Sequence, residues 1–160
     1  MAVIGGASCS DRQRTLALET GRCIARAGAI LLCGGRGGVM SAAAEGARSA
    51  GGGTVGILPG ASSTETPANA HIELPIYTGM GQARNLVLVL SADAVIGIGG
   101  GWGTLSEIGL ALKHGIPVVL LSSWQLHRPD GEDEPRLQHA DSAEQAVGLA
   151  LGAHHTRDPE

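Results

Sequence analysis

Short aliphatic runs alternate along this chain with longer segments whose apolar residues recur at helical spacing. Most of the runs are continuously apolar, so they predict strands whose two faces are both covered. The alternation of strand and helix predicts an α/β fold, with a mainly parallel sheet of about six strands and helices on both sides. The predicted strands lie in residues 3–4, 29–33, 54–58, 71–77, 94–98 and 117–121, and the predicted helices in residues 11–27, 39–50, 82–91, 104–114 and 142–151.

The length of 160 residues argues for a single domain. Hydrophobic residues make up 43% of the chain, but there is no Phe, so the core must be built from Ala, Val, Leu and Ile. We expect one ligand-binding domain over residues 1–152 and a flexible tail over residues 153–160. Residues 123–141 are polar and predict a surface loop, and the acidic stretch at 130–134 has no clear function.

The charge and the cysteine pattern exclude several classes of protein. With a net charge of −4 and no basic block, the chain has no surface suited to nucleic acid or to an acidic membrane. Its apolar runs are far shorter than the ~20 residues of a membrane span, and the N-terminus reads as a strand, not a signal peptide. Cys9, Cys23 and Cys33 form no CxxC pair, and no His stands at metal-ligand spacing, so we expect no metal site. These features favour a reduced, cytoplasmic protein.

Four glycine-containing turns follow predicted strands, at residues 5–6, 34–38, 59–60 and 99–103. The carboxyl ends of parallel strands share one edge of the sheet, which we call the rim, so these turns should gather there. Two of them run straight into helices, whose unpaired N–H groups and positive dipole end attract anions. One such turn is adequately explained as a tight turn, but several on one rim favour a phosphate-bearing ligand. The chain has no P-loop and no GxGxxG fingerprint, which argues against the usual ATP or NAD site.

Arg84 and Glu107 are the candidate reactive residues. Thr104 and Glu107 have the spacing of a capping box, which needs no further function. Glu107 also lies one turn into a helix that points its N-terminus at the rim, where a carboxylate could act as base or nucleophile. Arg84 stands near the start of another helix, where a cation calls for an anionic partner: Glu107, a phosphate, or both. The alternative for Arg84 is an exposed surface residue.

Arg36 and Trp102 lie inside glycine turns. Arg36 is a weaker candidate of the same kind as Arg84, and Trp102 would either stack on a ligand ring or cover its own loop. The residues that we predict to bind the ligand are Gly6, Gly34, Gly35, Arg36, Gly37, Gly38, Arg84, Gly99, Gly100, Gly101, Trp102, Gly103 and Thr104.

The stretch GGGWGTLSE at residues 99–107 resembles the P-G-G-x-G-T-x-x-E motif of the LONELY GUY-type proteins, often mislabelled as lysine decarboxylase-like. The stretches CGGRGGVMSAAAEGA, GILPG, TGMGQARN and SADAVIG extend this resemblance, and they look most like the branch that includes the molybdenum cofactor carrier proteins. The resemblance covers about residues 2–121. It implies a Rossmann-like three-layer sandwich that forms a homodimer or a homotetramer, and it does not imply a lysine decarboxylase.

The family resemblance also implies roles for particular residues. In the phosphoribohydrolase branch an Arg and the motif Glu hydrolyse the N-glycosidic bond of an N6-modified AMP, and by motif these are Arg84 and Glu107. In the carrier branch the same rim holds a pterin-phosphate cofactor without turning it over. This chain has Gly99 in place of the motif Pro and Asn85 where the hydrolases have Lys after the Arg. Both departures weaken the enzyme interpretation, while Arg84 and Glu107 keep it open.

Three functions therefore stay open. The first is a binding protein for a phosphate-bearing heterocycle, either a nucleotide monophosphate or the molybdenum cofactor, with no cofactor required for a reaction. The second is a nucleoside 5′-monophosphate phosphoribohydrolase, in which Glu107 stabilises or attacks an oxocarbenium-like centre and Arg84 orients Glu107 and the phosphate. The third is a nucleotide sensor that works through its oligomer. We favour the first.

Overall fold

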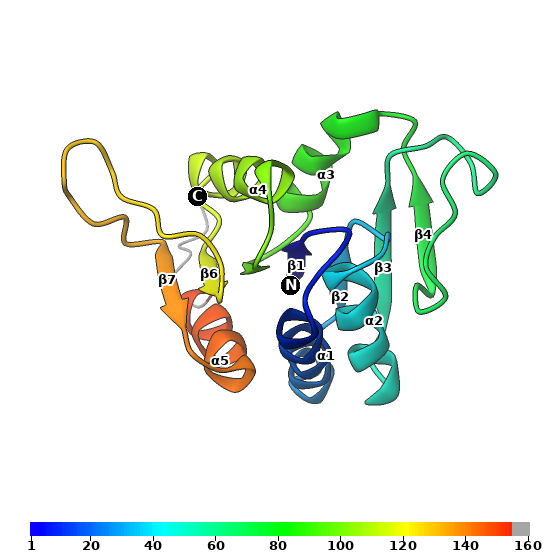
Figure 1. Ribbon diagram of the computed structural model, residues 1–160, viewed down its shortest axis with the longest axis horizontal. Coiled ribbons are helices and arrows are strands. Elements are labelled where there is room, and N and C mark those ends of the chain that lie inside the picture. The colour runs from blue at the N-terminus through cyan, green and yellow to red at the C-terminus, as the bar shows by residue number, and fades with distance from the viewer. Residues whose placement is uncertain (155–160) are drawn as a thin grey trace.

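A seven-stranded parallel sheet forms the middle layer of the computed structural model, which describes residues 1–154 (Figure 1). Every neighbouring pair of strands runs parallel, in the order β4-β3-β2-β1-β5-β6-β7. The strands are β1 (Ala2–Gly5), β2 (Leu31–Cys33), β3 (Thr54–Leu58), β4 (Leu74–Tyr77), β5 (Val95–Ile98), β6 (Val118–Leu121) and β7 (Leu137–Ala140). The predicted α/β class and its Rossmann-like three-layer form are confirmed, with one strand more than expected.

Strand β7 is the element that the sequence did not predict, because it lies inside the segment interpreted as a loop. It pairs with β6 from Val118 opposite Leu137 to Leu121 opposite Ala140. Its residues Leu137–Ala140 are mostly exposed or only partly buried. An edge strand with one covered side needs no continuous apolar run, and so its sequence resembles that of a loop.

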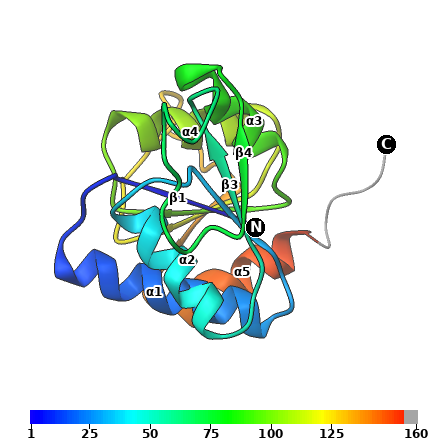
Figure 2. The ribbon, with the colours of Figure 1, turned by 90° about the vertical axis from the view of Figure 1, so that its right-hand side faces the viewer.

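The helices divide between the two faces of the sheet, as Figure 2 shows from the side. One face carries α1 (Asp11–Arg26), α2 (Val39–Ser49) and α5 (Ala143–His154), and the other carries α3 (Arg84–Leu90) and α4 (Trp102–Lys113). The short 3₁₀ turn η1 (Gly81–Ala83) leads into α3. No helix in residues 1–154 is long and apolar enough to cross a membrane. Helix α5 includes the first residues of the predicted tail, and residues 155–160 lie outside the described part of the chain.

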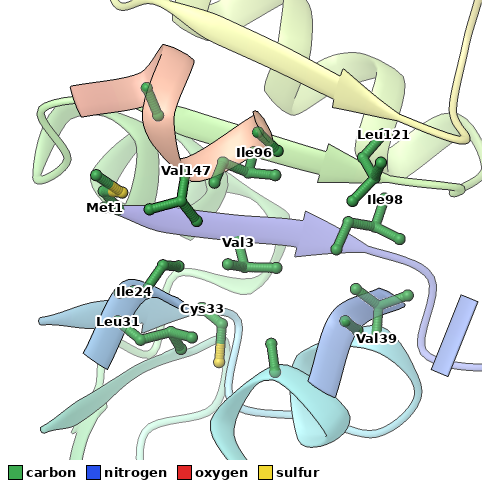
Figure 3. Close-up of a cluster of buried hydrophobic side chains, with 14 of the residues drawn as sticks. Met1, Val3, Ile24, Leu31, Cys33, Val39, Ile96, Ile98, Leu121 and Val147 are labelled. Atoms are coloured by element: carbon green, nitrogen blue, oxygen red, sulfur yellow. The ribbon is translucent and has the colours of Figure 1, made fainter. Parts of the chain in front are cut away.

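Alternate residues of each central strand pack into two separate hydrophobic cores, one on each face of the sheet. Val3 belongs to the cluster under α1, α2 and α5, while Ala2 and Ile4 belong to the cluster under α3 and α4. Figure 3 shows Val3 among residues such as Ile24 and Ile98 in the first cluster. Because both faces are covered, the strands carry the continuous apolar runs seen in the sequence.

The predicted capping box at the start of α1 is present. The Ser10 side chain accepts a bond from the Gln13 backbone N–H at 3.3 Å, and the Gln13 side chain accepts one from the Ser10 N–H at 3.0 Å. These two bonds satisfy backbone donors that the first helical turn leaves free.

Strands β1 and β5 are neighbours in the sheet but are followed by helices on opposite faces. After β1 the chain turns toward α1, and after β5 it turns toward α4 (Figure 1). In open parallel sheets this divergence leaves a crevice beyond the carboxyl ends of the two strands, where ligands bind. The fold therefore places the most favourable site beyond the carboxyl ends of β1 and β5, in the middle of the rim.

Candidate functional site

A pocket of about 240 Å³ lies at this position, and we call it the rim pocket. Backbone from the turns after β1, β2 and β5 forms part of its wall, together with side chains from η1, α3 and α4. Of the predicted site residues, those that line it are Gly6, Gly34, Arg36, Arg84, Gly101, Gly103, Thr104 and Glu107. The pocket therefore brings together residues from three turns that are far apart in the sequence.

Arg84 and Glu107 face each other in this pocket from two different helices. Arg84 Nη1 lies 3.7 Å from Glu107 Oε1, and the two side chains are only 10% and 8% exposed. That separation is an ion pair but is longer than a hydrogen bond. Arg84 is therefore not the exposed surface residue that was its alternative.

The capping-box interpretation of Thr104 and Glu107 is wrong. Helix α4 begins at Trp102, two residues before the predicted start, and its N-cap is Gly101, with no capping bond from a side chain. The earlier start is reached through Gly99 and Gly100, whose φ angles of +55° and +102° glycine adopts readily. Glu107 consequently lies in the second turn of the helix, where its carboxylate is buried beside Arg84.

Burial dominates the electrostatics of this pair. Loss of solvent raises the pKa of Glu107 to about 7, and the charge of Arg84 only partly opposes that change. The same loss of solvent lowers the pKa of Arg84 from its ordinary value, and the charge of Glu107 partly opposes it. Near neutral pH the pocket thus holds a charged guanidinium and a carboxyl group that exchanges its proton readily.

Several buried polar atoms around the pair have no hydrogen-bond partner among residues 1–154. They are Nε and Nη1 of Arg84 and Oδ1 of Asn85. Most buried polar atoms in folded proteins are paired, so an exception calls for a reason, such as a group that is bound during function. The Asn85 amide is oriented by Ser106, because Ser106 Oγ donates to Gly103 O at 2.8 Å and accepts from Asn85 Nδ2 at 3.4 Å.

The N-terminus of α4 adds backbone donors to the same wall. The first bond of the helix runs from Leu105 N–H to Gly101 O at 3.0 Å. The N–H groups of Trp102, Gly103 and Thr104 therefore precede the hydrogen-bond ladder of the helix. With the positive end of the helix dipole, they make this corner of the pocket suitable for an anion.

Gly34 allows Arg84 to lie against the turn after β2. A Cβ at position 34 would come within 2.5 Å of Arg84 Nη1 and 2.8 Å of Met40 Sδ. Below this turn, burial raises the pKa of the Cys33 thiol to about 11, so it stays protonated. A larger residue at position 34 would therefore require the Arg84 and Met40 side chains to move.

Gly99 has a backbone conformation that proline cannot adopt. Its φ is +55°, whereas the proline ring fixes φ near −65°. Its N–H also donates to Ser122 O at 3.1 Å, and proline has no N–H. The departure from the motif at this position is therefore matched by a different local path of the backbone.

Other predicted residues lie beside the rim pocket without lining it. They are Gly35, Gly37, Gly38, Gly99, Gly100 and Trp102. The Trp102 side chain is 79% exposed, and its ring lies 5.6 Å from that of Trp124, centroid to centroid. The Trp102 ring therefore contacts Trp124, in the segment after β6, and does not line the rim pocket.

Six residues of the wall were not predicted as ligand contacts: Ile4, Gly5, Ala7, Met40, Gln82 and Asn85. Gln82 and Asn85 belong to the TGMGQARN stretch that also supplies Arg84, so their place beside it in the sequence was the available signal. Met40 belongs in the same way to the CGGRGGVMSAAAEGA stretch that supplies Arg36, but an apolar residue in the first turn of a helix usually belongs to the core.

A group of potential metal ligands, Glu19, Cys23 and Glu144, lies on α1 and α5, away from the rim pocket. Glu19 pairs with Arg22 at 3.1 Å and with Arg26 at 3.6 Å, so its charge is already balanced. The expectation that the chain holds no metal stays a prediction.

The parallel sheet, the switch point between β1 and β5 and the pocket beyond it define a Rossmann-like α/β protein. The sequence profile of the SLOG cluster4 family matches residues 1–147, and the chain belongs to this family. The resemblance to the LONELY GUY-type proteins and their molybdenum cofactor carrier branch is thereby confirmed.

The sequence relatives include an uncharacterised protein and a phosphoribohydrolase. An uncharacterised protein from Archaeoglobus fulgidus is 45% identical over 76% of this chain and 78% of its own length. A cytokinin riboside 5′-monophosphate phosphoribohydrolase from Rhodococcoides fascians is 38% identical over 71% of this chain, which spans 62% of the enzyme.

The solved structures that share a third of their residues with this chain include molybdenum cofactor binding and carrier proteins. The molybdenum cofactor binding protein of Rippkaea orientalis has a TM-score of 0.83 and 35% identity, with 94% of each chain covered. The Moco carrier protein of Chlamydomonas reinhardtii has a TM-score of 0.84 and 34% identity, covering 98% of this chain and 97% of its own. The DNA processing protein A of Streptococcus pneumoniae, at 15% identity and a TM-score of 0.69, shares the fold alone.

Proposed function

We propose that the rim pocket binds a heterocycle that carries a phosphate monoester, and that the chain acts as a binding or carrier protein for such a ligand. The observation that carries this proposal is Arg84, whose buried Nε and Nη1 have no hydrogen-bond partner among residues 1–154. Leaving buried N–H groups without hydrogen bonds is costly, and an anion in the pocket would accept from them.

The charge of the pocket favours a dianion. Arg36 lines the pocket beside Arg84, and its charge contributes to lowering the Arg84 pKa. A phosphate monoester carries up to two negative charges near neutral pH and has three acceptor oxygens. It can therefore accept bonds from Arg84, Arg36 and the free N–H groups at the start of α4 at the same time.

Molybdopterin-type cofactors end in such a phosphate, and the residues present fit that group. Arg84, Arg36 and the backbone N–H groups of Gly103 and Thr104 would hold the phosphate. The likeness to two molybdenum cofactor proteins over more than nine-tenths of the chain supports this ligand over a nucleotide. When bound, the cofactor would be cargo, and the task of this chain would be to shield and release it.

Calorimetric titration with AMP, GMP and inorganic phosphate tests the binding proposal. Arg84→Lys keeps a charge but loses the planar fork, so its affinity for the monophosphates should fall about tenfold or more. Arg48→Lys is the matched control, because Arg48 forms an exposed pair with Glu73 at 2.8 Å outside the pocket. Failure of the wild-type chain to bind any of the three ligands would overturn the proposal. Pterin fluorescence released from protein purified out of cofactor-producing cells would identify the cofactor as the ligand.

A second candidate function is hydrolysis of a nucleoside 5′-monophosphate. Glu107 favours it, because a carboxyl group with a pKa of about 7 beside an arginine suits acid–base work near neutral pH. The test is release of free base from N6-substituted AMP. Release that Glu107→Gln abolishes while the fold stays intact would establish the enzyme, and no release together with tight binding would leave the carrier function.

We also propose that the chain forms homo-oligomers through the outer surface of α3 and β4. Leu86 and Leu90 on α3, with Leu74 and Ile76 on β4, are large aliphatic residues that are 36% to 56% exposed. Strand β4 is at the edge of the sheet beside β3, and α3 contacts β3 (Figure 1).

Light scattering after gel filtration tests this surface. Leu90→Lys should shift the chain to a smaller species, whereas Asp133→Lys, in the loop before the opposite edge strand, should not. A wild-type chain that is monomeric at high concentration would contradict the proposal.

Two further predictions remain part of the proposed function. One is a single binding domain over residues 1–152. The other is a cytoplasmic location, which the free thiols of Cys9, Cys23 and Cys33 support.

A further inference from the structure

A second depression, of about 350 Å³, adjoins the rim pocket, and we call it the side depression. It lies between the turn after β2 and the loop that joins β3 to β4. Arg36 lines both the rim pocket and the side depression, so the two hollows meet at its side chain. The residues that line the side depression are Arg36, Gly37, Glu65, Thr66, Pro67, Ala68 and Asn69.

Asn69 fastens the two walls of the side depression together. Its backbone N–H donates to Gly35 O at 2.9 Å, and its Nδ2 donates to Arg36 O at 2.9 Å. Its Oδ1 accepts from the His71 N–H at 3.0 Å. With the amide engaged in this way, Asn69 fixes the shape of the depression and leaves the recognition of a ligand to its neighbours.

The size of the two hollows indicates that they act together. Small-molecule sites usually occupy roughly 300–1,000 Å³. The rim pocket, at about 240 Å³, falls below this range by itself, and the side depression of about 350 Å³ brings the combined space within it. A ligand whose phosphate lies in the rim pocket therefore has room for its ring in the side depression.

Two charged side chains of opposite sign line the side depression without pairing with each other. Glu65 Oε2 accepts from the Ala61 N–H at 2.9 Å, which orients the carboxylate. Glu65 forms no ion pair in residues 1–154, and the Arg36 guanidinium has neither an ion pair nor a hydrogen bond in that part of the chain. The depression thus offers a carboxylate acceptor and a guanidinium donor, with Pro67 and Ala68 as apolar surface for the face of a ring.

We infer that the side depression selects a ring with a 2-amino-4-oxopyrimidine edge, as found in guanine and in pterins. Such an edge presents a ring N–H beside an exocyclic NH₂, and the Glu65 carboxylate can accept from both. The neighbouring ring carbonyl is an acceptor for Arg36, which has five donors to share between ring and phosphate. Adenine presents an unprotonated ring nitrogen in place of that N–H, and its lone pair would face the carboxylate. This inference rests on the proposed function and adds the class of ring that the site prefers.

Titration of the intact chain with GMP, IMP and AMP tests the inference. The wild-type chain should bind GMP about tenfold or more tightly than AMP, because guanine can donate two hydrogen bonds to the Glu65 carboxylate that adenine cannot. IMP, which keeps the ring N–H but lacks the 2-amino group, should lie between them. Glu65→Gln should remove most of the preference for GMP, while its side-chain oxygen can still accept from Ala61 and hold the loop. Glu45→Gln is the matched control, since Glu45 pairs with Arg14 on the helices outside the pocket.

The outcomes separate this inference from the proposed function. Equal binding of GMP and AMP, unchanged by Glu65→Gln but weakened by Arg84→Lys, would overturn the ring preference and leave phosphate binding in place. A GMP preference that persists in Glu65→Gln would show that another group reads the ring, and it would also overturn the inference. If the chain binds no monophosphate at all, both the inference and the proposed function fail.

Discussion

Glycine serves opposite purposes in two regions of this molecule: the crossing of α1 and α2, and the rim pocket. At the crossing, a Cβ on Gly21 or Gly46 would overlap the backbone oxygen of Ala43 or Leu18 in the other helix, so the helices pack backbone to backbone. At the rim, a Cβ on Gly101 or Gly103 would meet no atom within 4 Å. At the crossing, protein atoms fill the space beside the glycines, whereas Gly101 and Gly103 at the rim border space that protein does not fill.

The same contrast holds for polar groups. Exposed charged residues of the helical layer, such as Arg14 and Glu45, pair directly at 3.0 Å. The buried Arg84 and Glu107 stand 3.7 Å apart, and Arg84 keeps unpaired nitrogens. A region that is complete by itself satisfies its own polar atoms, whereas a binding region holds them for a ligand. Four substitutions test how far this difference goes.

The largest effect is expected for Gly21→Ala. The new methyl group would overlap the Ala43 carbonyl and push α1 from α2, at a cost of about 3 kcal/mol or more. Thermal unfolding should show a fall in Tm of roughly 10 °C. Gly148→Ala on α5 is the control, because its Cβ meets open space and an exposed helical Gly→Ala change should stabilise by up to about 1 kcal/mol. If the two variants changed Tm alike, the close packing at the crossing would be refuted.

Glu107→Gln should change the pH dependence of stability. The pKa of Glu107 in the folded chain, about 7, lies above its ordinary value of 4.5, so the folded chain binds more protons between these values. Wild-type stability should therefore fall as the pH rises from about 4.5 to about 7, by up to about 3 kcal/mol from this group. Denaturant unfolding across this range measures how the free energy of unfolding changes with pH. Glu107→Gln should flatten this dependence, and Glu45→Gln, at a partly exposed residue, should leave it unchanged. An identical slope in wild type and Glu107→Gln would show that Glu107 is ionised throughout.

Gly99→Pro, which restores the motif residue, should destabilise the chain by about 2 to 3 kcal/mol. The cost comes from a φ of +55° that proline cannot adopt and from the lost bond to Ser122 O. Gly101→Ala controls for a change in the same loop, since a Cβ there meets no atom within 4 Å. Unchanged denaturant unfolding of Gly99→Pro would mean that the loop can follow the proline path without cost.

The smallest change in stability is expected for Gly103→Ala, within about 0.5 kcal/mol. Its Cβ would enter open space, and Gly103 lines the rim pocket. Monophosphate affinity should nevertheless fall, because the methyl group would occupy space that the ligand needs. A large fall in Tm would show that the rim is packed like the helix crossing, and would remove the distinction between the two regions.

Much of this arrangement could be predicted from local sequence. The strands β1, β2, β3, β5 and β6 follow from continuous apolar runs, and the start of α1 follows from the Ser10 capping box. Strand β7 could not be predicted this way, because its residues form no continuous apolar run and only its pairing with β6 makes it a strand. The start of α4 was predicted two residues too late. The capping-box spacing of Thr104 and Glu107 is present in the sequence wherever the helix begins, so it could not show that the helix starts at Trp102.

The sequence by itself determined the layered α/β fold, the glycine turns after the strands and the presence of an arginine and a glutamate near them. Only the tertiary structure decided that Arg84 and Glu107 face each other in a buried pocket and that Arg36 joins this pocket to a second hollow lined by Glu65. The physical reason is that apolar periodicity and turn chemistry act over a few residues. The burial of Arg84 and Glu107, their ion pair and the free N–H groups of Arg84 depend instead on which distant segments the sheet brings together.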